Sequence, residues 1–266
     1  MKCNTIFITR ILISSGIFLL VFCSHFTIAF SQKNTEKFRE FKPNGLYHTL
    51  NFMVNLNAGN EEFVKYQGDY RFDVYHDKFI TYLIGNLEYK EGNTDVITNK
   101  GFIHGRFIFN KNKPFEPEIF AQMEYNDFLL MKERYLGGGG LRINPFSITS
   151  ADSVHKFIAE FGIGLMYEYE RTSDSLKPVT RYIRSTNFAS LRYTLQNNLN
   201  FFSVTYYQPH IKEFSDFRIL SENRLSISIN KYLAFFVSVM YRFDSEPISS
   251  LKNYDLEIAN GITITF

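Results

Sequence analysis

The last thirteen residues of the chain, Y-D-L-E-I-A-N-G-I-T-I-T-F at positions 254–266, alternate with a period of two. The even positions carry Tyr, Leu, Ile, Asn, Ile, Ile and Phe, and the odd positions carry Asp, Glu, Ala, Gly, Thr and Thr. Successive side chains of a β-strand point to opposite faces, so the stretch predicts a strand with one apolar and one polar face. In a barrel of the outer membrane, the apolar face of such a strand meets lipid and the polar face meets the lumen.

The same alternation recurs along the chain, most strictly in residues 64–74, where the odd positions Lys65, Gln67, Asp69, Arg71 and Asp73 are all polar. We expect strands at 46–57, 64–74, 79–90, 96–110, 118–125, 133–143, 157–169, 181–194, 199–207, 217–229, 233–243 and 254–266. Their length and even number are typical of bacterial outer-membrane strands. The sequence therefore predicts an all-β fold, a transmembrane antiparallel up-and-down β-barrel of about 12 strands spanning residues 46–266.

The lengths of the connections partly agree with this topology. Turns after even-numbered strands should be short, and 76–77, 196–198 and 230–231 are, whereas 111–117 and 144–155 are longer than expected. Loops after odd-numbered strands, such as 171–180 and 244–252, are longer and polar.

The glycine run at 137–140 falls inside the sixth expected strand. Glycine in a strand usually marks a bend or a close approach of backbones, so we expect sharp curvature of the sheet or a packed loop. A phosphate-binding loop is disfavoured because no Lys-Ser/Thr pair and no helical pattern follow the run.

The N-terminus predicts secretion. Residues 1–31 contain the basic residues Lys2 and Arg10, a short apolar core, and Ala29 and Ser31 at the spacing of a signal-peptidase site. We expect the mature chain to begin at Gln32, with residues 32–45 forming a periplasmic arm, and to reside in the outer membrane of a Gram-negative cell. A lipoprotein signal at Cys23 is the alternative, but the preceding bulky Phe22 disfavours it.

Composition limits the class of protein further. Both cysteines lie in the expected signal, and removal of its two basic residues leaves 27 basic residues to balance the 27 acidic ones. This balance argues against a nucleic-acid partner. Aromatic residues make up 17% of the chain, and after the signal there is no apolar run of about 20 residues that could form a membrane helix. An outer-membrane barrel and a secreted β-sandwich remain; strand length and the terminal Phe266 favour the barrel.

The inward polar faces are the candidate functional surface. We expect the lumen to contain Lys65, Asp69, Arg71, Asp73, His104, Arg106, Glu118, Glu124, Arg134, Arg142, Glu160, Glu168, Arg184, Arg192, Arg218, Glu222, Arg224, Asp255 and Glu257. Both signs of charge are present, which favours a lumen crossed by ion pairs or a narrow, porin-like solute passage over a selective filter.

No catalytic, metal or cofactor site is expected from the sequence. His104 is the one histidine expected to point inward at mid-strand, and no serine accompanies it in the pattern of a nucleophile and its base. No His/Cys cluster has metal-ligand spacing. A barrel enzyme acting on lipid or peptide, and a secreted soluble ligand-binding β-protein, are the alternatives to a structural protein or narrow pore.

Four motifs carry a resemblance to a known family: N-L-N-A-G-N at 55–60, Y-Q-G-D-Y-R-F at 66–72, Y-K-E-G-N-T at 89–94, and E-Y-N-D-F-L-L-M-K-E-R-Y-L-G-G-G-G-L-R-I at 124–143. They resemble the family of domain of unknown function 481, known as salt-induced outer membrane proteins; the second half of the chain resembles it only in strand pattern. The resemblance implies an outer-membrane β-barrel of unknown biochemical role, with no catalytic residues to carry over.

The expected partners follow from this placement. We expect outer-membrane lipid around a monomeric barrel. The last strand, ending in Phe266, resembles the signals that the barrel-assembly machinery reads.

Overall fold

The computed structural model describes residues 43–59, 62–92, 95–111, 113–149, 155–173, 178–195, 198–230, 233–247 and 251–264. The expected signal and Phe266 lie outside these residues, as does nearly all of the expected arm. The described strands are β1 (Gly45–Asn57), β2 (Phe63–Tyr75), β3 (Phe79–Gly92), β4 (Val96–Phe109), β5 (Phe115–Asn126), β6 (Met131–Thr149), β7 (His155–Thr172), β8 (Val179–Leu195), β9 (Leu199–His210), β10 (Glu213–Ser228), β11 (Leu233–Asp244) and β12 (Tyr254–Ile264), with a 3-10 helix η2 (Asp127–Leu129) between β5 and β6.

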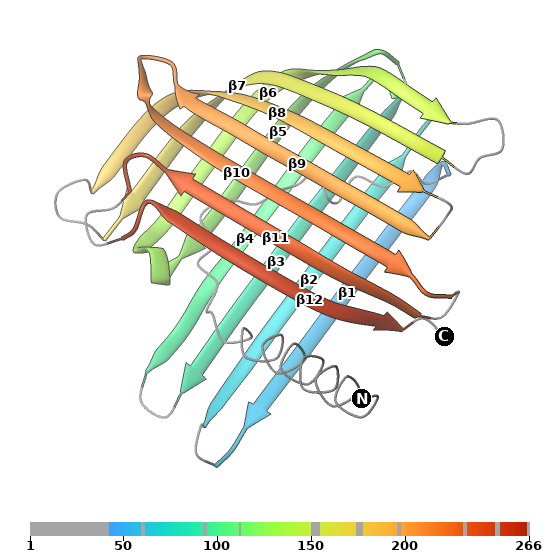
Figure 1. Ribbon diagram of the computed structural model, residues 1–266. Helices are drawn as coiled ribbons and strands as arrows, with labels where there is room; N and C mark the ends of the chain where they lie inside the picture. The colour runs from blue at the N-terminus through green and yellow to red at the C-terminus, as the bar shows by residue number, and fades with distance from the viewer. Residues whose placement is uncertain are drawn as a thin grey trace, which may run out of the picture.

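All twelve strands belong to one sheet, and each pairs antiparallel with its neighbour in the sequence (Figure 1). This meander confirms the expected all-β, twelve-stranded antiparallel fold. The strand order starts at β1 and ends at β12, and the described pairings include none between these two strands. Closure of the sheet, which the barrel prediction requires, is therefore not part of the described arrangement.

Most strands are longer than their alternation predicted, and β5 and β6 are two examples. β5 begins at Phe115 rather than at residue 118, and β6 continues to Thr149 rather than ending at residue 143. A β-bulge explains the second difference, because pairing between β6 and β7 shifts after Ile143 and resumes at Phe146. The connection expected over 144–155 is correspondingly shorter.

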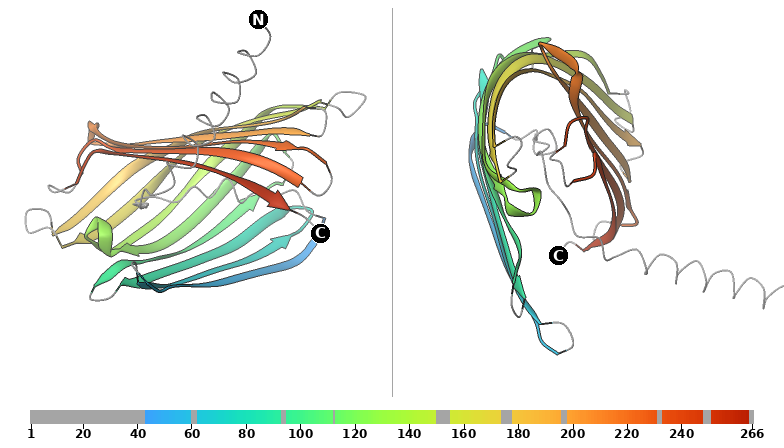
Figure 2. Two further views of the ribbon diagram at one scale, coloured as in Figure 1. Left: turned by 60° about the horizontal axis from the view of Figure 1, so that its bottom comes forward. Right: turned by 90° about the vertical axis from the view of Figure 1, so that its left-hand side faces the viewer.

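The sheet is bent into a deep trough, with β1–β4 on one side and β10–β12 on the other (Figure 2). Glycines lie on its inner face where β6 and β7 meet. Gly140 pairs directly with Gly164, and a Cβ on Gly164 would stand 2.6 Å from the carbonyl oxygen of Gly139. The glycine run thus permits close backbone approach at the bend, in agreement with the curvature interpretation, and it lies within a strand rather than a loop.

The two faces of the sheet differ in the way the alternation predicted. On β7, Phe161, Ile163 and Leu165 are 46–59% exposed on the outer face, whereas Glu160 and Glu168 are buried on the inner face. Apolar side chains also predominate among the exposed outward residues of the other strands, such as Ile119 on β5 and Ile258 on β12. No helix among the described residues is long and apolar enough to cross a membrane.

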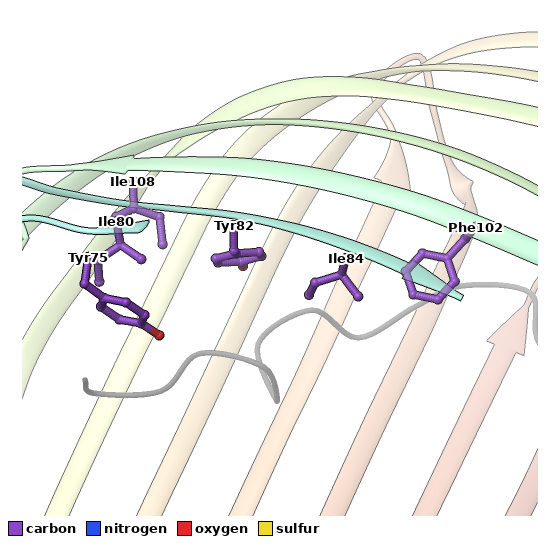
Figure 3. Close-up of a cluster of buried hydrophobic side chains, with 6 residues drawn as sticks. All are labelled: Tyr75, Ile80, Tyr82, Ile84, Phe102 and Ile108. Atoms are coloured by element: carbon purple, nitrogen blue, oxygen red, sulfur yellow. The ribbon is translucent and has the colours of Figure 1, made fainter. Parts of the chain in front are cut away.

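The inner face also carries apolar side chains, which the sequence did not predict. Figure 3 shows the largest group, contributed by β2, β3 and β4: Tyr75, Ile80, Tyr82, Ile84, Phe102 and Ile108. A second group, from β8, β9 and β10, consists of Phe188, Val204, Tyr206 and Leu220. The two-residue period does place Phe102 and Ile108 on the same face as His104 and Arg106, but it does not show that apolar side chains of different strands pack together there.

Candidate functional site

Charged side chains on the inner face form two ion-pair clusters. We call the end of the sheet where β1 begins and β12 ends the terminal end, and the opposite end the far end. The far-end cluster comprises Glu124, Glu168, Glu170, Arg134, Arg184, Arg218, Asp216 and Asp244. The terminal-end cluster comprises Arg106, Glu116, Glu118, Arg142 and Glu160.

Glu168 is the centre of the far-end cluster. It accepts hydrogen bonds from Arg134 Nη2 at 3.0 Å and from Arg218 Nη1 at 2.7 Å, and Arg184 Nε lies 3.4 Å away. The side chain of Glu168 is fully buried, as is that of Arg134. One buried carboxylate therefore ties together three arginines from β6, β8 and β10.

The other acids of the far-end cluster form ion pairs with the same arginines. Arg134 Nη1 donates to Glu124 at 3.0 Å. Arg184 Nη2 donates to Asp216 at 2.8 Å, and Arg218 Nε donates to Asp244 at 2.8 Å. Opposite charges and hydrogen bonds together offset the cost of taking these groups out of water.

Arg142 holds the terminal-end cluster together. Its Nη2 donates to Glu118 at 2.9 Å, and its guanidinium carbon lies 4.7 Å above the ring of Phe188. Glu118 also accepts from Arg106 at 2.9 Å, which connects β4 to β6 through β5. The cluster packs charge against an aromatic ring within the bend of the sheet.

A histidine and a glutamine link the two clusters. Arg106 Nε lies 3.4 Å from His104 Nε2, and His104 Nδ1 lies 3.0 Å from Gln122 Oε1. Gln122 Nε2 donates to Glu124 at 3.0 Å, and Glu124 belongs to the far-end cluster. The inner face of β4–β11 therefore carries one continuous chain of polar contacts between the two clusters. Both ring nitrogens of His104 are engaged by Arg106 and Gln122, an arrangement unlike a base poised beside a serine.

A cavity of about 320 Å³ lies at the far end. Arg218, Arg242 and Asp244 line its floor, and Leu251, from the connection between β11 and β12, packs against Leu129 and Met131. Two further cavities, lined by residues of the two clusters, measure about 30 and 10 Å³. A cavity of about 10–15 Å³ holds roughly one water. The gaps between side chains of the two clusters are thus far smaller than the cavity at the far end.

The expected lumen residues face inward, but they differ in burial. Asp73, His104, Arg106, Glu124, Arg142, Glu160 and Glu168 are buried. Asp69, Arg71, Arg192, Asp255 and Glu257 are partly exposed, and Arg224 is exposed. Arg71 pairs with Asp73 at 2.7 Å, and Arg224 lies over the ring of Phe236. The two clusters therefore collect only some of the expected residues.

Sequence reasoning missed Glu116, Asp216 and Asp244 because each lay just outside an expected strand. Continuing the two-residue period beyond the expected strand ends would have placed all three on the inner face. No group of three His, Cys, Asp or Glu within the described ranges is arranged to hold a metal ion.

The fold and this inner surface define a class of protein: a single antiparallel meander with an apolar outer face and an ion-paired inner face. The family model for the protein of unknown function DUF481 matches residues 50–266, and the chain belongs to that family. The resemblance seen in the motifs is thereby confirmed. Neither the comparison with curated proteins nor that with solved structures returned a match.

Proposed function

We propose that this chain is an integral outer-membrane protein whose sheet closes into a barrel when β12 pairs with β1. Its role is structural, with an interior plugged by ion pairs rather than open as a general pore. The observation that carries the proposal is a distribution of polarity opposite to that of a soluble protein. Charged clusters are buried on the inner face, and apolar side chains are exposed on the outer face. A barrel surrounded by lipid needs this distribution, whereas a soluble protein must cover its apolar face.

Aromatic residues at both ends of the outer face support the membrane placement. At the terminal end, Phe79 and Phe107 stack with ring centroids 5.0 Å apart. At the far end, Phe217 lies 5.6 Å from Tyr207 and 5.4 Å from Phe243. Outer-membrane barrels carry such aromatic girdles where the apolar band meets the two membrane surfaces.

The ion-pair clusters support a plugged interior. Side chains from β4 to β11 meet across the inner face, and the cavity at the terminal-end cluster measures about 10 Å³. Solutes larger than water do not fit such a space. A narrow pore is the second candidate, and the cavity of about 320 Å³ at the far end is the observation that favours it.

Fractionation and gel migration test the membrane placement. The expected result is a chain in the outer-membrane fraction that migrates differently on gels before and after heating, as folded barrels do. Recovery of a fully soluble protein would overturn the proposal.

Cysteine cross-linking tests closure. A cysteine at the inward-facing Asn51 of β1 is combined in turn with one at Glu257, Ala259 and Gly261, the inward-facing positions along β12. We expect one combination to form an intramolecular disulfide in membranes, with a matched pair of Asn51→Cys and Ile103→Cys as the negative control. The oxidation must be strong enough to link two cysteines exposed side by side on a protein surface. If all three combinations remain reduced under these conditions, the sheet does not close in this way.

Single-channel recording in planar bilayers separates the plugged barrel from the pore. The natural chain should pass no current above background. Replacing two partners of opposite sign together, Glu124→Ala with Arg134→Ala, keeps the net charge and should raise the conductance. A large steady conductance of the natural chain would favour the pore.

A further inference from the structure

Six small polar side chains form a patch on the outer face of β8, β9 and β10. The patch, which we call the outer polar patch, consists of Ser185, Asn187, Ser203, Thr205, Ser221 and Asn223. These side chains point away from the ion-pair clusters, because Arg184, Val204 and Glu222 beside them are buried on the inner face. Apolar side chains exposed on the same outer face, including Ile183, Tyr207 and Leu225, surround the patch.

The patch lies halfway along the strands. Asn187 is the central residue of β8, which runs from Val179 to Leu195. Thr205 pairs with Ser221, and Ser203 pairs with Asn223, near the middle of β9 and β10. On the neighbouring β7, the outer positions at this height are Ile163 and Leu165, both more than half exposed. In the barrel proposed above, the patch therefore lies near the middle of the bilayer.

Four of the six side chains form one hydrogen-bonded group, and the other two, Ser185 and Asn187, bond each other. Ser203 Oγ donates to Asn223 Oδ1 at 2.7 Å, and Asn223 Nδ2 donates to Ser221 Oγ at 3.2 Å. Thr205 Oγ1 and Ser221 Oγ lie 2.9 Å apart. Asn187 Nδ2 donates twice, to Ser185 Oγ and to the backbone oxygen of Tyr207. Asn223 Nδ2 donates only to Ser221 among the described residues, so the group around it keeps part of its hydrogen-bonding capacity, since an amide carries two donors and a hydroxyl also accepts.

The hydrocarbon of the bilayer is an unfavourable environment for these polar side chains. Hydrocarbon offers no hydrogen bonds to the remaining donors and acceptors, and polar groups facing it cost free energy. Inside membranes, Ser, Thr and Asn at mid-depth typically lie where two protein segments pack, because small side chains permit close approach and their polar groups bond across the contact.

We propose that the outer polar patch is the contact surface between two copies of this chain in the membrane; the proposal rests on the membrane placement proposed above. A second copy fits because Ser, Thr and Asn each both donate and accept hydrogen bonds. A patch built from them is complementary to itself, as a twofold contact requires, since the same surface meets on both subunits. None of its six residues is charged, so two copies meet without repulsion. The sequence alone predicted a monomer, and the patch is the observation that argues for a dimer.

Cysteine cross-linking in native membranes tests the contact. The two natural cysteines, Cys3 and Cys23, lie in the expected signal and are replaced by serine. Single cysteines are then placed at Asn187, Thr205 or Asn223. The matched control is Ile103→Cys, which lies on the same outer face at the centre of β4, away from the patch strands β8, β9 and β10. On oxidation, most of the chain carrying a cysteine in at least one patch position should run as a disulfide-linked dimer on the gel. The control variant should form only the small fraction of dimer that random collision in the membrane produces.

A second variant tests the chemistry of the patch rather than its position. Thr205→Val combined with Ser221→Ala and Asn223→Leu makes the patch apolar and keeps it compact. We expect the mass of the detergent-solubilised natural chain to be that of two copies, and the mass of this variant to fall twofold while its heat-dependent gel migration is retained.

The possible failures are distinguishable. A heat-modifiable chain in the outer-membrane fraction whose patch cysteines cross-link no more than Ile103→Cys would overturn the dimer and leave the barrel in place. A chain absent from that fraction would overturn the barrel and, with it, the dimer.

Discussion

Replacing Glu168 by leucine should destabilise the folded chain strongly. The substitution removes the carboxylate that accepts from Arg134 and Arg218 and lies 3.4 Å from Arg184. The three buried guanidinium groups would then share fewer acids, and loss of one partner of a buried ion pair costs about 3–5 kcal/mol. In equilibrium unfolding by urea of the folded chain in detergent, a slope of about 2 kcal/mol per molar converts this loss to a midpoint lower by roughly 2 M.

An exposed ion pair provides the matched control. Glu133 accepts from Arg171 Nε at 2.7 Å, but the two side chains are 25% and 48% exposed. Glu133→Gln should therefore cost only about 0–1 kcal/mol. If Glu168→Leu and Glu133→Gln lower the free energy of unfolding equally, the buried cluster does not stabilise the protein.

A double variant tests the physical cause of the loss. Glu168→Leu combined with Arg134→Met removes a buried charge of each sign, and replacing both members of a buried pair is often nearly neutral. The double variant should thus be more stable than Glu168→Leu alone. A double variant less stable than the single one would refute the uncompensated charge as the source of the loss.

Two further perturbations test the bend and the far end. Gly162→Ala should destabilise the fold by about 1–3 kcal/mol, because a Cβ there would lie 1.9 Å from the Phe188 ring. Gly137→Ala, which meets nothing within 4 Å, should cost much less in the same urea unfolding; equal losses would contradict the close approach at the bend. Cysteines at Leu129 and Leu251, which belong to one apolar cluster, should form a disulfide in the folded chain, and their failure to do so under oxidation would mean that Leu251 does not pack against this cluster.

Alternation predicted the strands well because it reflects a local property of extended backbone. Side chains two residues apart share a face whatever the strand pairs with, so the inward set from Asp69 to Asp73 follows from the sequence alone. Strand ends were less predictable, since they depend on pairing with neighbours. The bulge that carries β6 past Ile143 to Thr149 is an example, because its cause is the register of β7.

The composition of the ion-pair clusters could be predicted, but their arrangement could not. Arg134, Glu168 and Arg218 were each expected to face inward, but nothing in the sequence shows that Glu168 bonds both arginines. Arg134 and Glu168, 34 positions apart, meet because β6 pairs with β7. Glu168 and Arg218, 50 positions apart on β7 and β10, meet because the sheet bends. The bend depends on backbone approach at Gly140 and Gly164, which the glycine run indicated only in general terms.

The two edges of the sheet give the strongest physical reason for closure. β1 pairs only with β2, and β12 pairs only with β11, so each presents a row of backbone groups without a strand partner in the described arrangement. The outer faces of both strands carry exposed apolar residues, such as Phe52 and Ile258, and these favour lipid. Backbone groups beside them would then lie in hydrocarbon, where each unsatisfied group costs several kcal/mol. Pairing β1 with β12 satisfies both rows at once, and an even number of strands joins them antiparallel, as every other pair in the sheet is joined.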